Sequence, residues 1–150
     1  MDRRQLLGQV YMFRHAAPDD LTALLEQAET KSCRPGDTIY RKGERAAELY
    51  VIESGTVDIG LPDHDVPIAT VGSGQAFGEV AFFDHDERTA MARTRETTRL
   101  LRIPYDRLDE LIAERPDFGV AFYRSTCAFL TGHLRRLVLD LNVDMNRRFL

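Results

Sequence analysis

The sequence predicts an α+β fold, mainly β, in which a β-sandwich or barrel is flanked by helices at both ends. Three observations predict it. Seven of the ten glycines lie between Gly36 and Gly78. They separate short apolar segments that recur about every 8–12 residues, as in all-β domains. Helical spacing of apolar residues is confined to the two ends. A chain of 150 residues fits one domain, and we divide it into N-terminal helices (1–29), strands (30–103) and C-terminal helices (104–145).

Composition excludes several classes of function. A net charge of -4 argues against nucleic acid as the default partner, because DNA-binding domains need a basic face. No apolar run is long enough for a membrane span or a secretory signal. The two cysteines, Cys33 and Cys127, form no CxxC pair, so zinc and iron–sulfur sites are not expected. We therefore expect a cytoplasmic protein without a metal.

The N-terminal segment predicts two helices. Apolar residues at 6, 7, 10 and 13 have helical spacing. A second helix starts at Pro18, where proline fits the first turn and the following acids face the positive end of the helix dipole. Its buried face is expected to contain Leu21, Leu24, Leu25 and Ala28.

The middle segment predicts short strands joined by turns. Val57, Ile59 and Leu61 alternate with polar residues or glycine, which is typical of a half-buried strand. Cys33 is expected to be a buried strand residue. The predicted strands are 38–41, 48–53, 56–61, 67–71, 88–94 and 97–103.

The C-terminal segment predicts a helix over 105–114 and a long helix after Pro116. The long helix carries apolar residues at alternating steps of three and four, an a/d heptad pattern. This seam comprises Val120, Tyr123, Cys127, Leu130, Leu134, Leu137 and Leu141. Two interpretations stay open: pairing with a second chain, or packing on the chain's own domain.

The segment 77–90, FGEVAFFDHDERTA, predicts a binding site. We expect Gly78-Glu79 to leave a strand and open one helical turn, whose first N–H groups form an anion site. The loop 84–87 is exposed, and Arg88 returns to the same pocket as a phosphate ligand. Glu79 suits the hydroxyls of a ribose, so the set describes a nucleotide with one phosphate. The other side of the turn is expected to be buried by Val80, Phe82 and Phe83.

This segment resembles the phosphate-binding cassette of cyclic nucleotide-binding domains. The family pattern is Gly-Glu followed about nine residues later by Arg, a small or hydroxyl residue, and Ala. The matching residues are Gly78, Glu79, Arg88, Thr89 and Ala90. The segments 34–59 and 71–79 also resemble the family, and the similarity covers most of residues 10 to 140.

The resemblance implies an antiparallel β-roll, a jelly-roll-like double-stranded β-helix, and a set of roles. Glu79 would bind the ribose 2′-hydroxyl, and Arg88 the exocyclic phosphate oxygens. Backbone N–H groups around Val80 and Ala81, with Thr89, would complete the cradle, next to Ala90. The Thr89 hydroxyl can bond the phosphate of either nucleotide or the amino group of guanine; of the two ligands we favour cAMP over cGMP.

The resemblance also gives the long helix two roles, as a lid over the base and as a homodimer interface. Base contacts are then expected near Thr131, His133, Arg135 or Arg136, although these residues also suit the solvent-facing side of an amphipathic helix. The chain ends at Leu150 without room for a helix-turn-helix, so it is either a piece of a longer protein or a free-standing domain. We do not expect direct DNA binding.

The expected function is therefore a sensor that binds a cyclic nucleotide, catalyses nothing and passes the change to a second copy or an unidentified effector protein. Two alternatives stand beside it. Glu79 and Arg88 could form a salt bridge in a degenerate domain that binds only proteins. A metal enzyme of the cupin type, or a haem or iron–sulfur sensor, needs clustered histidines or cysteines, whereas His64 and His85 sit in separate loops.

Overall fold

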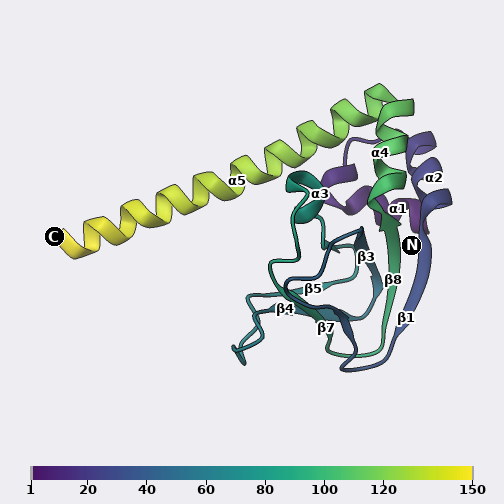
Figure 1. Cartoon of the computed structure of the whole chain (residues 1–150). Coiled ribbons are helices and arrows are strands. Elements are labelled where there is room, and N and C mark those ends of the chain that lie inside the picture. The colour runs from purple at the N-terminus through teal and green to yellow at the C-terminus, as the bar shows by residue number, and fades with distance from the viewer. Residues whose placement is uncertain (1, 150) are drawn as a thin grey trace.

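Two four-stranded antiparallel sheets face each other and form the β part of the molecule (Figure 1). This computed structural model describes the backbone of residues 2–149 and the side chains of residues 2–141. The first sheet has the strand order β1 (Glu29–Cys33), β8 (Thr98–Pro104), β3 (Glu48–Ser54) and β6 (Ala76–Phe77). The second has the order β2 (Thr38–Tyr40), β7 (Met91–Thr94), β4 (Thr56–Gly60) and β5 (Ala69–Gly72). The α+β class with antiparallel sheets, as predicted from the sequence and its family resemblance, is confirmed.

The first sheet is buried on both faces, which explains the unbroken apolar run in β3. Leu49 and Val51 face the helices, whereas Tyr50 and Ile52 face the second sheet. Strand β8 divides in the same way along its length. Because successive side chains of a strand point to opposite faces, a strand buried on both sides shows no polar alternation.

Helices cover the outer face of the first sheet. They are α1 (Arg3–Gln9), the 3₁₀ turn η1 (Tyr11–Phe13), α2 (Pro18–Gln27) and α4 (Tyr105–Glu114). Asp2 caps α1 by accepting a hydrogen bond from the Gln5 N–H at 2.8 Å. In α2, Leu21 and Leu24 are buried as predicted, whereas Leu25 and Ala28, expected on the same buried face, are only partly buried. These helices and the first sheet share one apolar core, and the two sheets enclose another.

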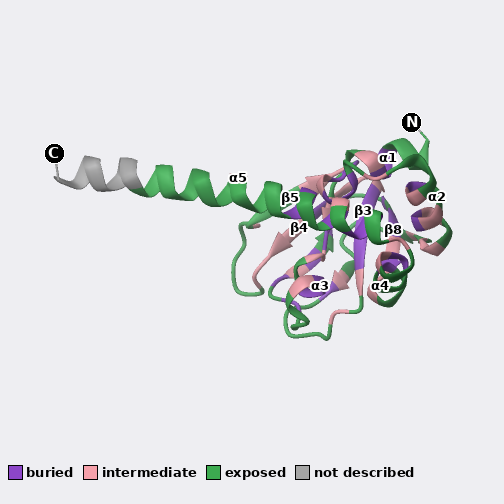
Figure 2. Ribbon diagram, turned by 90° about the horizontal axis from the view of Figure 1, so that it is seen from above, coloured by how far each residue is buried: buried purple, intermediate pink, exposed green. Residues whose placement is uncertain are grey.

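The last helix, α5 (Pro116–Phe149), begins on the domain and then extends beyond it (Figures 1 and 2). Its domain-facing side contains Phe118, Phe122 and Thr126, all buried. The heptad seam lies on another side, so packing on the chain's own domain does not account for it. Every seam residue is exposed: Val120, Tyr123, Cys127, Leu130, Leu134, Leu137 and Leu141. In the part of the chain that the structure describes, no helix combines the length and the hydropathy needed to cross a membrane.

The sequence missed two strands and placed most of the others within a few residues. Strand β1, with the sequence ETKSC, is polar because it lies at a sheet edge and is mostly exposed. Its last residue, Cys33, is buried, as predicted. Strand β6 has two residues, too few to show a pattern. The strand predicted over 88–94 begins only at Met91, which leaves Arg88 in the loop before it.

Candidate functional site

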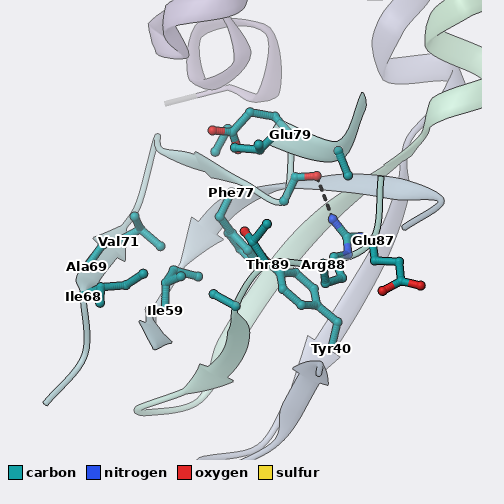
Figure 3. A pocket seen from close by; sticks show the side chains of 15 residues that line it. Tyr40, Ile59, Ile68, Ala69, Val71, Phe77, Glu79, Glu87, Arg88 and Thr89 are labelled. Carbon is teal, nitrogen blue, oxygen red and sulfur yellow. Dashed lines mark hydrogen bonds between the residues drawn. The ribbon is translucent and has the colours of Figure 1, made fainter. Parts of the chain in front are cut away.

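A pocket of about 280 Å³ opens on the side of the β-roll, beside the short helix α3 (Val80–Asp84) (Figure 3). Strands β2, β4, β5 and β6 form its other walls. The structure brings all seven residues of the predicted binding set to this pocket: Gly78, Glu79, Val80, Ala81, Arg88, Thr89 and Ala90. Its volume lies near the lower end of the range for small-molecule sites, roughly 300–1,000 Å³.

The fold requires a glycine at position 78, even without a ligand. Its φ of 76° lies in the left-handed region, which residues with a Cβ avoid. A Cβ built at this position would lie 2.9 Å from Arg88 Nη1 and close to the rings of Tyr40 and Tyr50. The sequence predicted this glycine as a place where a ligand approaches the backbone. The structure shows that its first consequence is to make room for the Arg88 guanidinium.

Arg88 is buried and joins three parts of the fold. Its Nη1 donates to the Gly78 carbonyl at 2.8 Å and to the Tyr105 hydroxyl at 3.2 Å. Its Nη2 donates to the Glu48 carbonyl at 2.6 Å. The guanidinium carbon lies 4.1 Å from the centre of the Tyr40 ring, a cation–π distance. The charge is thus held by carbonyl dipoles and aromatic faces at the floor of the pocket, where Figure 3 shows the bond to Gly78.

Glu79 occupies the opposite side of the pocket, and its two carboxylate oxygens differ. Oε1 accepts a hydrogen bond from the Tyr11 hydroxyl at 3.3 Å. Oε2 is shielded from solvent and has no partner among the described residues. Burial raises the pKa of the Glu79 carboxyl above its ordinary value. Hydrogen bonds from its own backbone and from Tyr11, and the charge of Arg88, offset part of that rise in pKa.

The prediction that Val80 is buried is wrong. We expected Val80, Phe82 and Phe83 to bury one side of the turn together. Phe82 is buried and Phe83 is partly buried, whereas Val80 is 57% exposed and lines the pocket. Ala81 takes the inward position instead. The turn is a regular α-helix, so residues one and two positions apart point in different directions.

An apolar wall, which was not predicted from the sequence, faces the charged residues across the pocket. It contains Ile59, Ile68 and Val71, which lie in or next to β4 and β5 (Figure 3). Ile59 was expected to share the buried face of its strand with Val57. Val57 is buried, but Ile59 is only partly buried and turns into the pocket. Ile68 is 64% exposed, an unusual fraction for isoleucine that could have marked it as a contact residue.

The predicted lid residues lie outside the pocket in this structure. Thr131, His133, Arg135 and Arg136 are exposed on α5. The His133 ring packs edge-on against Phe129, with 4.3 Å between ring centres, and Arg136 contacts His133 Nδ1 at 3.3 Å. None of these four lines the pocket. Their contact with a base stays a prediction that requires α5 to move.

The alternative interpretations can be compared with the geometry. Within residues 2–141, Glu79 and Arg88 form no ion pair, so the structural salt bridge that we weighed is absent. The described residues also contain no group of three or more histidine, cysteine or acidic side chains that could hold a metal ion. His85 ends α3 with a φ of 56°, and His64 lies in the exposed loop between β4 and β5.

The pocket therefore combines a buried arginine, a carboxylate with an unpaired oxygen and an apolar wall in one site. Residues 30–115 match the sequence profile of the cyclic nucleotide-binding domain. The chain belongs to this family. The match includes both sheets, α3 and α4.

Relatives of this cyclic nucleotide-binding domain serve in different proteins. A CRP-like cAMP-activated global transcriptional regulator from Mycobacterium tuberculosis is 32% identical over 123 residues, covering 80% of this chain and 55% of the regulator. The mouse potassium/sodium hyperpolarization-activated cyclic nucleotide-gated channel 2 is 29% identical over 119 residues, covering 79% of this chain and 14% of the channel. The chain thus spans about half of the first relative and a small part of the second.

The fold is likewise found in solved structures. The catabolite activator protein of Thermus thermophilus superimposes with a TM-score of 0.74 at 27% identity, over 89% of this chain and 62% of that protein. The likeness confirms the β-roll with flanking helices that the sequence resemblance implied.

Because Arg88 joins three elements, its replacement should lower the stability of the domain even without ligand. Arg88→Ala loses hydrogen bonds from a charged donor to two carbonyls, each contributing roughly 1.5–3 kcal/mol. We expect urea denaturation to show a loss of about 3 kcal/mol in the free energy of unfolding. Arg93→Ala is the matched control, because Arg93 is exposed and donates to one carbonyl, that of Gly36; it should cost less than about 1 kcal/mol. Equal losses would contradict a structural role for Arg88.

The buried Glu79 carboxyl predicts a stability difference that depends on pH. Its raised pKa means that the folded protein holds the proton more tightly than the unfolded chain, so stability falls as pH rises through the folded pKa. Glu79→Gln cannot ionise and escapes this loss. At pH 8 the variant should therefore be more stable than the wild type. At pH 4, Glu79 is largely protonated in both the folded and the unfolded wild type. We therefore expect no difference in stability between the wild type and the variant at that pH.

The measurement is urea denaturation at several pH values, without ligand. Glu26→Gln, on the exposed side of α2, controls for the loss of one negative charge. A stability gain for Glu79→Gln that stays constant between pH 4 and pH 8 would contradict the predicted shift in the Glu79 pKa.

Proposed function

We propose that this domain binds cAMP in the pocket beside α3 and acts as a sensor without catalytic activity of its own. One observation supports this most directly. A single small pocket places an unpaired carboxylate oxygen, a guanidinium and an apolar wall around the same space. These are complements to a ribose hydroxyl, a phosphate and a purine, respectively.

The phosphate end is assigned to Arg88, Thr89 and the start of α3. A guanidinium has five N–H donors, and the three hydrogen bonds of Arg88 to the protein leave donors for a phosphate. Val80 and Ala81 are the first two residues of α3, so their N–H groups have no acceptor inside the helix. Thr89 is exposed in the pocket and adds a hydroxyl. Ala90 is small and buried beneath them.

The ribose end is assigned to Glu79 and the base to the apolar wall. Glu79 Oε2 can accept a hydrogen bond from a 2′-hydroxyl without giving up the bond from Tyr11. Ile59, Ile68 and Val71 offer apolar surface to either purine. The preference for cAMP rests on the Mycobacterium tuberculosis relative, whose name states cAMP activation, and Thr89 is compatible with it.

One observation favours the alternative, a module that binds proteins and no nucleotide. Arg88 is already bonded to Gly78, Glu48 and Tyr105, so the fold alone accounts for its presence. The protein-binding alternative does not account for Glu79 Oε2, a buried acceptor without a partner in the described chain. A ligand donor at Glu79 would satisfy that oxygen, and we therefore favour the sensor.

Calorimetric titration tests the proposal directly. Protein shown to be free of co-purified nucleotide should bind cAMP more tightly than cGMP, and 5′-AMP more weakly than either. At a cAMP concentration of about 100 times the dissociation constant, the free energy of unfolding should rise by about 2.7 kcal/mol. Glu79→Gln should weaken cAMP binding about tenfold, since a neutral amide is a poorer acceptor. Failure of the wild type to bind either cyclic nucleotide would leave the protein-binding module as the function.

We further propose that two copies pair through the heptad seam of α5. The domain-facing side of this helix already contains Phe118 and Phe122, and the seam residues remain exposed. An apolar seam at alternating steps of three and four is the surface that a second helix buries. Pairing would let the cytoplasmic sensor pass a change in α5 to a second copy or to an effector protein.

Sedimentation of two leucine variants tests the seam. Leu134→Arg places a charge in the seam, whereas Leu139→Arg makes the same change at a residue that is equally exposed but off the seam, 57% against 62%. We expect the wild type and Leu139→Arg to sediment as dimers and Leu134→Arg as a monomer. A monomeric wild type, with or without cAMP, would overturn the dimer.

A further inference from the structure

Tyr11 lies between the pocket residue Glu79 and the long helix α5, and it contacts both. Its hydroxyl donates to Glu79 Oε1 at 3.3 Å. Its ring stacks on Phe129 of α5, with 3.9 Å between the ring centres and 10° between the ring planes. Tyr11 does not line the pocket itself, so its influence on a ligand has to pass through Glu79.

The position of Tyr11 is coupled to α5 by its neighbours in the 3₁₀ turn η1. Met12 and Phe13 are both buried. The Phe13 ring lies 5.9 Å from that of Phe122 and 6.4 Å from that of Phe118, both on α5. Tyr11 therefore cannot keep its place if α5 moves away from η1, because the same helix holds its ring and its neighbour.

The Glu79 carboxylate is hydrogen-bonded at one oxygen and has no partner among the described residues at the other. Oε1 has the Tyr11 hydroxyl, whereas Oε2 is buried and has no partner among the described residues. A carboxylate fixed by one hydrogen bond cannot rotate freely, so its second oxygen keeps a defined direction. Burial also raises the pKa of the Tyr11 hydroxyl, which keeps this group a donor.

We propose that Tyr11 is a positioning residue of the ligand site, which orients Glu79 Oε2 toward a hydroxyl of the bound nucleotide. This inference rests on the proposed function. Because Phe129 holds the Tyr11 ring, the placement of α5 sets the affinity for ligands that carry this hydroxyl. By linkage, a ligand bound through Glu79 favours the placement of α5 in which Tyr11 and Phe129 are stacked.

The experiment compares cAMP with 2′-deoxy-cAMP, which lacks only the hydroxyl that Glu79 would bind. Tyr11→Phe keeps the ring on Phe129 and removes the hydrogen bond to Glu79. Phe129→Ala keeps the hydroxyl and removes the stack. Each variant should weaken the binding of cAMP about tenfold and change the binding of 2′-deoxy-cAMP less than about twofold, since one oriented hydrogen bond to a charged group is at stake.

Three further variants separate positioning from general damage. Tyr50→Phe removes another tyrosine–glutamate hydrogen bond, the 2.7 Å bond from Tyr50 to Glu48, and Tyr50 does not line the pocket; it should leave both affinities unchanged. Phe129→Tyr keeps an aromatic ring in the stack and should restore wild-type affinity. The double variant Tyr11→Phe/Phe129→Ala should bind cAMP no more weakly than Tyr11→Phe, because Phe129 acts through Tyr11.

The outcomes are distinct. An equal loss of affinity for both nucleotides in Tyr11→Phe would show that Tyr11 only supports the fold, and the inference would be overturned. Unchanged or tighter binding of cAMP by Tyr11→Phe would overturn it as well. If the wild type binds neither nucleotide, the proposed function itself fails, an outcome visible before any variant is tested.

Discussion

The buried guanidinium of Arg88 is the interaction on which the rest of the site depends. It bonds the Gly78 carbonyl before α3, the Glu48 carbonyl at the start of β3 and the Tyr105 hydroxyl at the start of α4. A buried charge without a counterion is costly unless dipoles solvate it. Here two carbonyls, a hydroxyl and the Tyr40 ring do so. The same contacts demand a left-handed glycine at position 78, because a side chain there would meet the guanidinium.

From this arrangement follows the division of the pocket. Arg88 fixes the cationic end at the floor, and α3 starts at Val80, two residues after Gly78, so its first N–H groups fall next to that end. Glu79 is then forced into a partly buried position across the pocket, where desolvation raises its pKa. The apolar end is made by another pair of strands, β4 and β5. The chemistry of a nucleotide is thus matched by two parts of the chain, the segment 77–90 and the strands β4 and β5.

Much of this could be predicted from the sequence because the signals are local. The spacing from Gly78-Glu79 to Arg88 identified the cassette, and the glycines marked the turns. What failed was non-local. Val80 and Ala81 exchanged roles because burial depends on which side of a short helix meets the core. Ile59 and Ile68 are ordinary strand residues until the fold brings them to the pocket. The bond of Arg88 to the main-chain carbonyl of Glu48 leaves no trace in the Glu48 side chain.

Helix α5 shows why a sequence pattern can be correct and still incomplete. The heptad seam was visible because it repeats, whereas the buried side, with Phe118 and Phe122, was not separated from it. The two sides carry different constraints: one is fixed to the domain and contacts η1, and the other is exposed. Any event that shifts α5 relative to η1 changes both the stacking of Phe129 on Tyr11 and the position of the heptad seam. In the proposed mechanism, Tyr11 links Glu79 in the pocket to Phe129 on α5. A ligand that favours one placement of α5 would then be favoured in turn by whatever binds that placement.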